Sequence, residues 1–162
     1  MKILILVSAL LFYPFNSFTN YRQQLSGFDQ VKINKELLLK LINQVRQKGC
    51  TCGSVTYSSA SPLQWNEQLE KAAFKHCMDM NNNKYLSHIG TDGSGVGERM
   101  EKEGYQWTNY AENIGMGYLT EQEVINGWLH SEGHCKNLMN KTYKEIGASR
   151  VGQYWTLDFG AR

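Results

Sequence analysis

The stretch Asn126–Asn140, with the sequence NGWLHSEGHCKNLMN, gathers two histidines, a cysteine and two glycines within fifteen residues. An apolar helical stripe ends at Trp128, and Gly133 then predicts the end of the helix. We therefore expect His134 and Cys135 to lie on a turn beyond the helix. Because a turn can direct side chains into a cleft, this stretch is the first candidate for a functional site.

The two histidines of this stretch have the i, i+4 spacing of a zinc-protease helix, which places two imidazoles on one helix face. That motif requires Glu directly after the first His and an unbroken helix. Here Ser131 follows His130, and Gly133 lies inside the span. The pattern therefore argues against a metalloprotease helix. His130 is better explained as a solvated residue at a helix C-terminus, where a protonated imidazole complements the helix dipole.

The composition indicates a single globular domain. The chain has 162 residues, of which 41% are hydrophobic and 20% charged, enough for one core and short for two domains. Lys and Arg number 17 against 15 Asp and Glu, so there is no electrostatic case for a nucleic-acid partner. We expect a monomer that binds no nucleic acid.

Residues 1–19 are typical of a signal peptide, with one positive charge at Lys2 followed by an apolar run. The run is short for a membrane span; an uncleaved anchor is the alternative. Residues 20–33 show no sustained periodicity and are interpreted as an N-terminal arm, so the domain occupies residues 34–162. We expect a protein that is secreted or held at the cell surface, without a transmembrane segment after signal removal.

Four cysteines in an exported chain predict a disulfide framework. Cys50 and Cys52 are too close to pair comfortably with each other, so one is expected to join Cys77 and the other Cys135. The residues alone do not decide which one. A zinc site is disfavoured, because Cys-Thr-Cys lacks the two-residue gap of a zinc knuckle.

Hydrophobic periodicity predicts four helices. Asn34 and Asn66 are suitable N-caps for the first two, and Thr120 begins a capping box for the fourth. Cys77 falls on the inward face of the second helix, whereas His76, at the edge of the same stripe, is interpreted as a surface residue. The predicted helices cover residues 35–48, residues 67–83, residues 97–102 and a segment that follows Thr120 and ends before Gly133.

The strand signals are fewer. Tyr110–Gly117 predicts a short buried strand or extended turn that carries Glu112, and a buried carboxylate requires a partner. Residues 145–151 and 154–159 alternate well enough for two strands joined by a two-residue turn. Residues 50–61 are small and polar and are expected to form a loop.

Several motifs occur together in the order found in one family. They are Leu86-Ser87-His88, the Asp92-Gly93 turn, Tyr110-Ala111-Glu112-Asn113-Ile114, Gly127-Trp128-Leu129, Gly133-His134-Cys135-Lys136-Asn137-Leu138-Met139 and the final hairpin. The chain resembles the CAP superfamily (cysteine-rich secretory proteins, antigen 5 and pathogenesis-related proteins, or SCP domains) in a compact bacterial form. This resemblance implies an α+β fold, a three-layer α-β-α sandwich with a small central antiparallel sheet, stapled by disulfides.

The resemblance also implies a central cavity formed by His88, Glu112 and His134. A second family glutamate does not carry over, because Ser131 stands at its position. The resemblance further implies a disulfide between Cys52 and Cys135, which would leave Cys50 and Cys77 as an extra pair.

Family members have been credited with lipid or sterol binding, protease activity and protein binding, so the site must decide the function. The chain lacks a convincing nucleophile, which favours a non-catalytic module that binds a lipid-like or sterol-like molecule or a partner protein. The alternative is a secreted hydrolase using His134, Glu112 and Ser131. We also expect His88 and His134 to bind zinc or another divalent metal, with Glu112 as their partner or as a third ligand.

Overall fold

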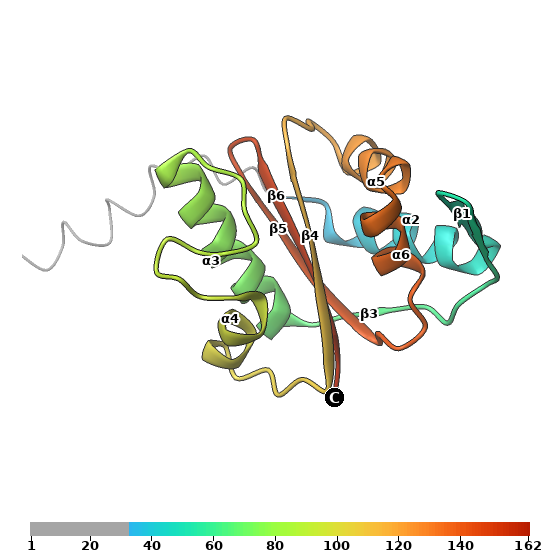
Figure 1. Ribbon diagram of the computed structural model, residues 1–162, viewed down its shortest axis with the longest axis horizontal. Coiled ribbons are helices and arrows are strands. Elements are labelled where there is room, and N and C mark those ends of the chain that lie inside the picture. Colours follow the sequence, from blue (N-terminus) through green and yellow to red (C-terminus); the bar gives the residue numbers. More distant parts are fainter. Residues whose placement is uncertain (1–32) are drawn as a thin grey trace, which may run out of the picture.

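The computed structural model describes residues 33–162, which fold into three layers (Figure 1). A four-stranded sheet lies between two helical layers, and a separate two-stranded sheet flanks one of them. The helices are α2 (Lys35–Lys48), α3 (Glu67–Asn83), α4 (Val96–Lys102), α5 (Glu121–His130) and α6 (Glu132–Met139). The strands are β1 (Cys50–Cys52), β2 (Val55–Tyr57), β3 (Gln64–Trp65), β4 (Asn109–Met116), β5 (Glu145–Val151) and β6 (Tyr154–Ala161).

The layers match the expected α-β-α sandwich. Helices α3 and α4 cover one face of the central sheet, and α2, α5 and α6 cover the other (Figure 1). The sheet has the order β3-β5-β6-β4, so the last two strands of the chain lie at its centre and β4 forms an edge. The three long strands are antiparallel, as expected, whereas the two-residue β3 adds a parallel pairing with β5 that the sequence did not predict.

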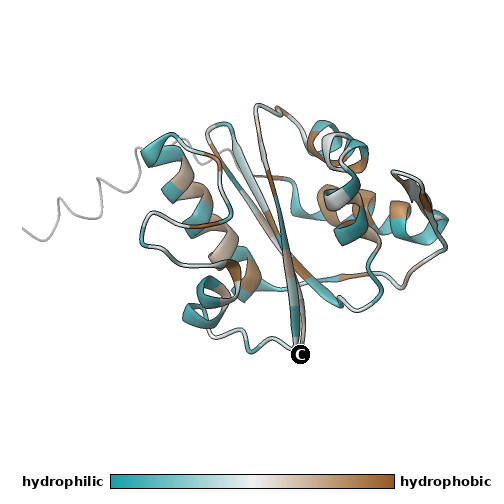
Figure 2. Cartoon of the chain, in the orientation of Figure 1, coloured by the Kyte–Doolittle hydropathy of each residue, from teal (hydrophilic) through white to brown (hydrophobic). Residues whose placement is uncertain are grey.

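Strand β6 is buried along its whole length, because helices cover both of its faces. Leu157 and Phe159 pack into the core beneath α2 and α5. Thr156 faces α3, where its hydroxyl lies 3.2 Å from the Cys77 sulfur. Figure 2 shows the same division on α3, whose side facing the sheet is more hydrophobic than its outer side.

The first two helices begin where the sequence predicted. The Asn34 side chain accepts a hydrogen bond from the Leu37 backbone, and Asn66 caps α3 in the same way. Gly147 on β5 lets α3 approach closely, because an added Cβ would lie 2.0 Å from the Glu70 backbone nitrogen. Helix α3 therefore packs against the backbone of β5.

The predicted break at Gly133 is wrong. Helix α5 ends at His130, Ser131 is extended with φ −98° and ψ 118°, and Gly133 lies inside α6. The chain can restart at once, because the Ser131 carbonyl accepts a hydrogen bond from the Cys135 backbone at 2.8 Å. His134 and Cys135 consequently lie on a helix and not on a turn.

Only one of the two predicted disulfides is present. Cys52 and Cys135 are bridged, with Cα atoms 5.5 Å apart, whereas Cys50 and Cys77 are free thiols. The expected Cys50–Cys77 pair is wrong, because Cys77 lies on α3, across the central sheet from β1 (Figure 1). The predicted loop at residues 50–61 is also partly wrong, since β1 and β2 form a hairpin there.

The predicted signal peptide, residues 1–19, and nearly all of the predicted arm, residues 20–33, lie outside the described residues. Among the helices of residues 33–162, none has the length and apolar character that a membrane crossing requires.

Candidate functional site

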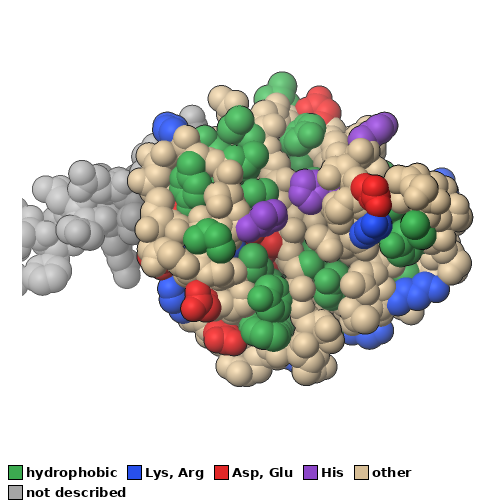
Figure 3. Space-filling view, in the orientation of Figure 1, with side chains coloured by type: hydrophobic (Ala, Val, Ile, Leu, Met, Phe, Trp, Pro, Cys, Tyr) green, Lys and Arg blue, Asp and Glu red, His purple; other side chains and the backbone are tan. Residues whose placement is uncertain are grey.

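The predicted site residues gather at the free edge of β4. Successive residues of this strand point to opposite layers, so Glu112 faces α3 and α4 while Asn113 faces α6. His88 reaches Glu112 from the α3 side, and His134 lies on α6. Figure 3 shows two histidine side chains close together at the centre of this face, with hydrophobic side chains around them.

Glu112 is buried, with 5% of its surface exposed, and both of its oxygens are engaged. Its Oε1 accepts a hydrogen bond from His88 Nδ1 at 2.7 Å, and its Oε2 accepts one from Arg99 Nη2 at 2.7 Å. His76 Nε2 lies 3.9 Å from Oε1. The buried carboxylate therefore has the partner that its burial demands.

The buried side chains of Arg99 and His76 make hydrogen bonds to the backbone of the segment that carries His88. Arg99 Nη1 donates to the carbonyls of His88, at 3.0 Å, and Ser94, at 2.9 Å. The ring of His76 is hydrogen-bonded through Nε2 to the Ser87 carbonyl at 2.7 Å. Its Nδ1 is buried and has no hydrogen-bond partner in the described part of the chain, and burial lowers the pKa of His76. We therefore assign His76 as a neutral imidazole that donates to Ser87.

The surface position expected for His76 is thus wrong. A usable signal was present, because His76 follows Ala72 and Ala73 by four and three residues, the spacing of the buried stripe of α3. Arg99 was missed as well. Its helix contains charges of both signs, and the sequence offers nothing that selects Arg99 as the partner of Glu112.

A second carboxylate lies beneath Glu112. Asp158 on β6 is the cross-strand partner of Glu112, so the two side chains project from the same face of the sheet. Asp158 is 1% exposed, and neither of its oxygens has a hydrogen-bond partner within residues 33–162. Burial, reinforced by the charge of Glu112, raises the pKa of Asp158 well above its ordinary value. Asp158 is therefore best described as a neutral carboxylic acid.

The other half of the site is fixed by asparagines. Asn113 donates to the His134 carbonyl at 3.1 Å, and Asn137 donates to the Asn113 side chain at 2.8 Å. These bonds attach α6 to β4 and so position His134. Burial, and then the nearby His88, lower the pKa of His134. Ser131 occupies the N-cap position of α6, but its side chain makes no capping hydrogen bond. Within residues 33–162 it makes no hydrogen bond to His134 either.

The histidine pair fits part of a metal site. A metal-binding histidine usually donates its second ring nitrogen to a carboxylate, and His88 has that arrangement with Glu112, which leaves its Nε2 available. The ring of His134 makes no hydrogen bond within the described chain. Glu112 does not fit as a third ligand, because His88 and Arg99 engage its two oxygens. The residues present thus supply two nitrogens for an ion.

A pocket of about 260 Å³ lies behind the His88 segment and shares His76 and Arg99 with the site. Neither this pocket nor two others, at residues 92–102 and residues 40–62, is lined by His88 or His134. The face around the histidines instead exposes large apolar side chains. Leu86 and Ile89 lie close to His88 in the sequence, and Tyr110 and Met116 belong to β4.

Comparison with known proteins agrees with this architecture. The sequence model of the family described as "CAP: Cysteine-rich secretory protein family" matches residues 39–159. Two curated relatives from Bacillus subtilis are similar: protein YkwD, 31% identical over 136 residues, and membrane protein YlbC, 29% identical over 126 residues, both described as uncharacterized. The matches cover 83% and 78% of this chain but only 49% and 34% of those proteins.

Solved structures show the same fold. An extracellular protein containing an SCP domain from Bacillus anthracis has a TM-score of 0.69 at 26% identity, over 78% of this chain and 40% of that one. An outer surface protein from Borrelia burgdorferi has a TM-score of 0.68 at 21% identity, over 83% of this chain and 98% of that one. With the sandwich, the edge-strand site and the family match together, the chain belongs to the CAP, or cysteine-rich secretory protein, family.

Proposed function

We propose that this CAP-domain protein is a secreted or cell-surface binding module, whose ligand contacts the face around His88 and His134 and is not chemically transformed there. One observation carries the proposal: Glu112, the carboxylate of the site, is paired with Arg99 and His88. Because hydrogen bonds from His88 and Arg99 occupy both of its oxygens, Glu112 has no oxygen free to take a proton from a substrate, as a general base must.

The hydrolase alternative lacks its nucleophile. A serine nucleophile needs a hydrogen bond to its base and a third group that orients the base. In the described chain Ser131 makes no hydrogen bond to His134, and no carboxylate orients the His134 ring. We expect no turnover of peptide or ester substrates, and turnover that disappears in His134→Ala would overturn this part of the proposal.

The shape of the face favours a partner protein over an enclosed lipid-like or sterol-like molecule. Small ligands are usually held in cavities that bury most of their surface. The histidines instead lie on an open face flanked by Leu86 and Ile89, which are 47% and 53% exposed. Large apolar side chains exposed next to one another often mark a protein interaction surface.

The test is capture from the protein's natural surroundings, followed by mass spectrometry of bound proteins and of extracted lipids. The informative variant is Ile89→Asp, which places a charge on the proposed face. Val55→Asp is the matched control, because Val55 is exposed to a similar degree, 44%, but lies on the small sheet. We expect a specific protein with the wild type and Val55→Asp and its loss with Ile89→Asp. Equal recovery with all three would refute binding at this face.

A further inference from the structure

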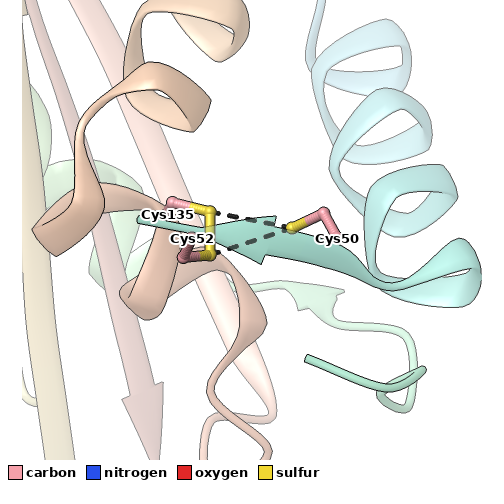
Figure 4. Close-up of side chains that lie close together, drawn as sticks. All are labelled: Cys50, Cys52 and Cys135. Carbon is pink, nitrogen blue, oxygen red and sulfur yellow. Dashed lines mark hydrogen bonds between the residues drawn. A yellow bond between two sulfur atoms is a disulfide. The ribbon is translucent and has the colours of Figure 1, made fainter. Parts of the chain in front are cut away.

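The disulfide between Cys52 and Cys135 has a third sulfur beside it. The free Cys50 Sγ lies 3.6 Å from Cys135 Sγ and 3.8 Å from Cys52 Sγ (Figure 4). Within residues 33–162, these three cysteines are the one group of three potential metal-ligating side chains whose ligand atoms lie within 4.8 Å of one another. The cluster shares no residue with the histidine site, although Cys135 directly follows His134 on α6.

The regular geometry of β1 explains the cluster. Residues two apart on a strand point to the same side, so Cys50 and Cys52 both face α6 and its Cys135. The sequence Cys-Thr-Cys therefore places two cysteines within reach of Cys135. Cys52 and Cys135 are fully buried, whereas Cys50 is only half-buried.

We propose that the three cysteines form a thiol–disulfide exchange centre, in which Cys50 can replace Cys52 as the partner of Cys135 and so expose the bridge to external small-molecule thiols. The Cys50 thiolate forms a bond to Cys135 Sγ, and the bond between Cys135 and Cys52 breaks. Cys52 leaves as a thiolate and takes up a proton, which balances the one lost by Cys50. The number of disulfides is unchanged, so the step requires no oxidant.

Cys135 is the sulfur that Cys50 is expected to attack. Attack on Cys52 would join two residues of one extended strand, whose Cα atoms are roughly 6.6 Å apart, near the upper limit for a disulfide. The Cys50 sulfur is almost equally distant from both bridged sulfurs, so it lies beside the bond. In-line attack therefore requires a small movement of β1.

The hairpin that carries Cys50 is suited to such a movement. Strands β1 and β2 have three residues each and form a sheet of their own, outside the central sheet. Isolated two-stranded hairpins are only marginally stable. The hairpin can therefore shift along α6 while the four-stranded sheet stays intact.

The exchange changes which sulfur solvent can reach. In the bridge between Cys52 and Cys135 both sulfurs belong to buried residues, so an external thiol has no direct access. A bridge between Cys50 and Cys135 includes a half-buried cysteine, which a small thiol can attack. Cys50 therefore provides the route by which the buried bridge is opened.

Two measurements test the proposal. First, the oxidised Cys52→Ser variant is alkylated under native conditions and mapped without reduction, with Cys50→Ser as the matched control. We expect a bridge between Cys50 and Cys135 in the first variant and the original bridge in the second. Alkylation of both Cys50 and Cys135 in folded Cys52→Ser, as judged by circular dichroism, would overturn the proposal.

The second measurement does not depend on the folding of Cys52→Ser. Dithiothreitol reduction of the bridge is followed by acid-quenched alkylation in the full-length wild type and in Cys50→Ser. Burial raises the pKa of the Cys50 thiol, so the assay is run at alkaline pH, where more of the reactive thiolate is present. We expect Cys50→Ser to be reduced at least tenfold more slowly. Equal rates would refute a role for Cys50.

Discussion

Replacement of Arg99 by Met tests whether the buried charge cluster holds the site together. Arg99 Nη2 donates to Glu112 at 2.7 Å, and its Nη1 donates to the carbonyls of His88 and Ser94. Methionine preserves much of the aliphatic length but supplies no donor and no charge. Glu112 would then be buried beside Asp158 with His88 as its remaining close partner.

The expected destabilisation follows from these contacts. Removal of one member of a buried ion pair typically costs about 3–5 kcal/mol, because the remaining charge stays desolvated. His88 still engages one oxygen of Glu112, so we expect the lower end, about 3 kcal/mol. For a domain of this size that corresponds to a decrease in melting temperature of roughly 10 °C.

Urea unfolding followed by tryptophan fluorescence provides the measurement, with the free energy obtained by linear extrapolation. Lys136→Met is the matched control, because Lys136 pairs with Glu132 on the exposed surface of α6. Such a pair contributes about 0.3–0.5 kcal/mol. A loss below about 1 kcal/mol for Arg99→Met would refute the reasoning, since breaking a buried pair should cost several times as much.

Three further predictions concern titratable groups. The raised pKa of Asp158 means that the unfolded carboxyl ionises above about pH 4 while the folded one keeps its proton, so stability falls as pH rises. Asp158→Asn should therefore be more stable than the wild type at pH 7 by about 1 kcal/mol or more, and equal urea midpoints there would contradict this. The lowered pKa values of His76 and His134 mean that their unfolded forms take up protons first as pH falls below about 6.5. The Asp158→Asn background removes the opposite pH dependence that Asp158 contributes, so in this background the urea midpoint should decrease between pH 7 and pH 5. If the double replacement His76→Gln and His134→Gln left this decrease in midpoint unchanged, the explanation would be wrong. Calorimetric titration should show zinc uptake at neutral pH that is lost in acid and in His88→Ala but kept in His130→Ala, because ligands must be neutral imidazoles; uptake unaffected by His88→Ala would exclude the histidine pair.

Local signals were sufficient for much of the fold. Helix α2 begins after Asn34 and ends before Gly49, as predicted, because a side-chain cap and a glycine with φ 75° fix its ends. The hairpin of β5 and β6 was equally accessible, since its turn glycine and strand alternation lie within one segment. The short β3 was not, because its two residues become a strand only through pairing with β5.

The site was predicted less completely, because its supporting contacts join distant parts of the chain. The family resemblance indicated His88, Glu112 and His134, and the structure places all three at the edge of β4. Arg99 and Asp158 were not identified, because their importance arises from burial beside Glu112. The erroneous Cys50–Cys77 pair has the same origin, since sequence spacing does not reveal that the central sheet separates these residues.

The strand order has a consequence for the way the chain can fold. β5 and β6, the last two strands in sequence, are central, and β3 and β4 pair with them and not with each other. Strands β3 and β4 therefore have no sheet to join until the chain has been synthesised through Ala161. Before that point the earlier helices also lack the hydrophobic sheet against which they pack. Contacts of such long sequence separation form slowly. The domain is consequently expected to remain without its core until β6 has been synthesised, so its apolar segments stay unpaired and open to chaperones up to that point.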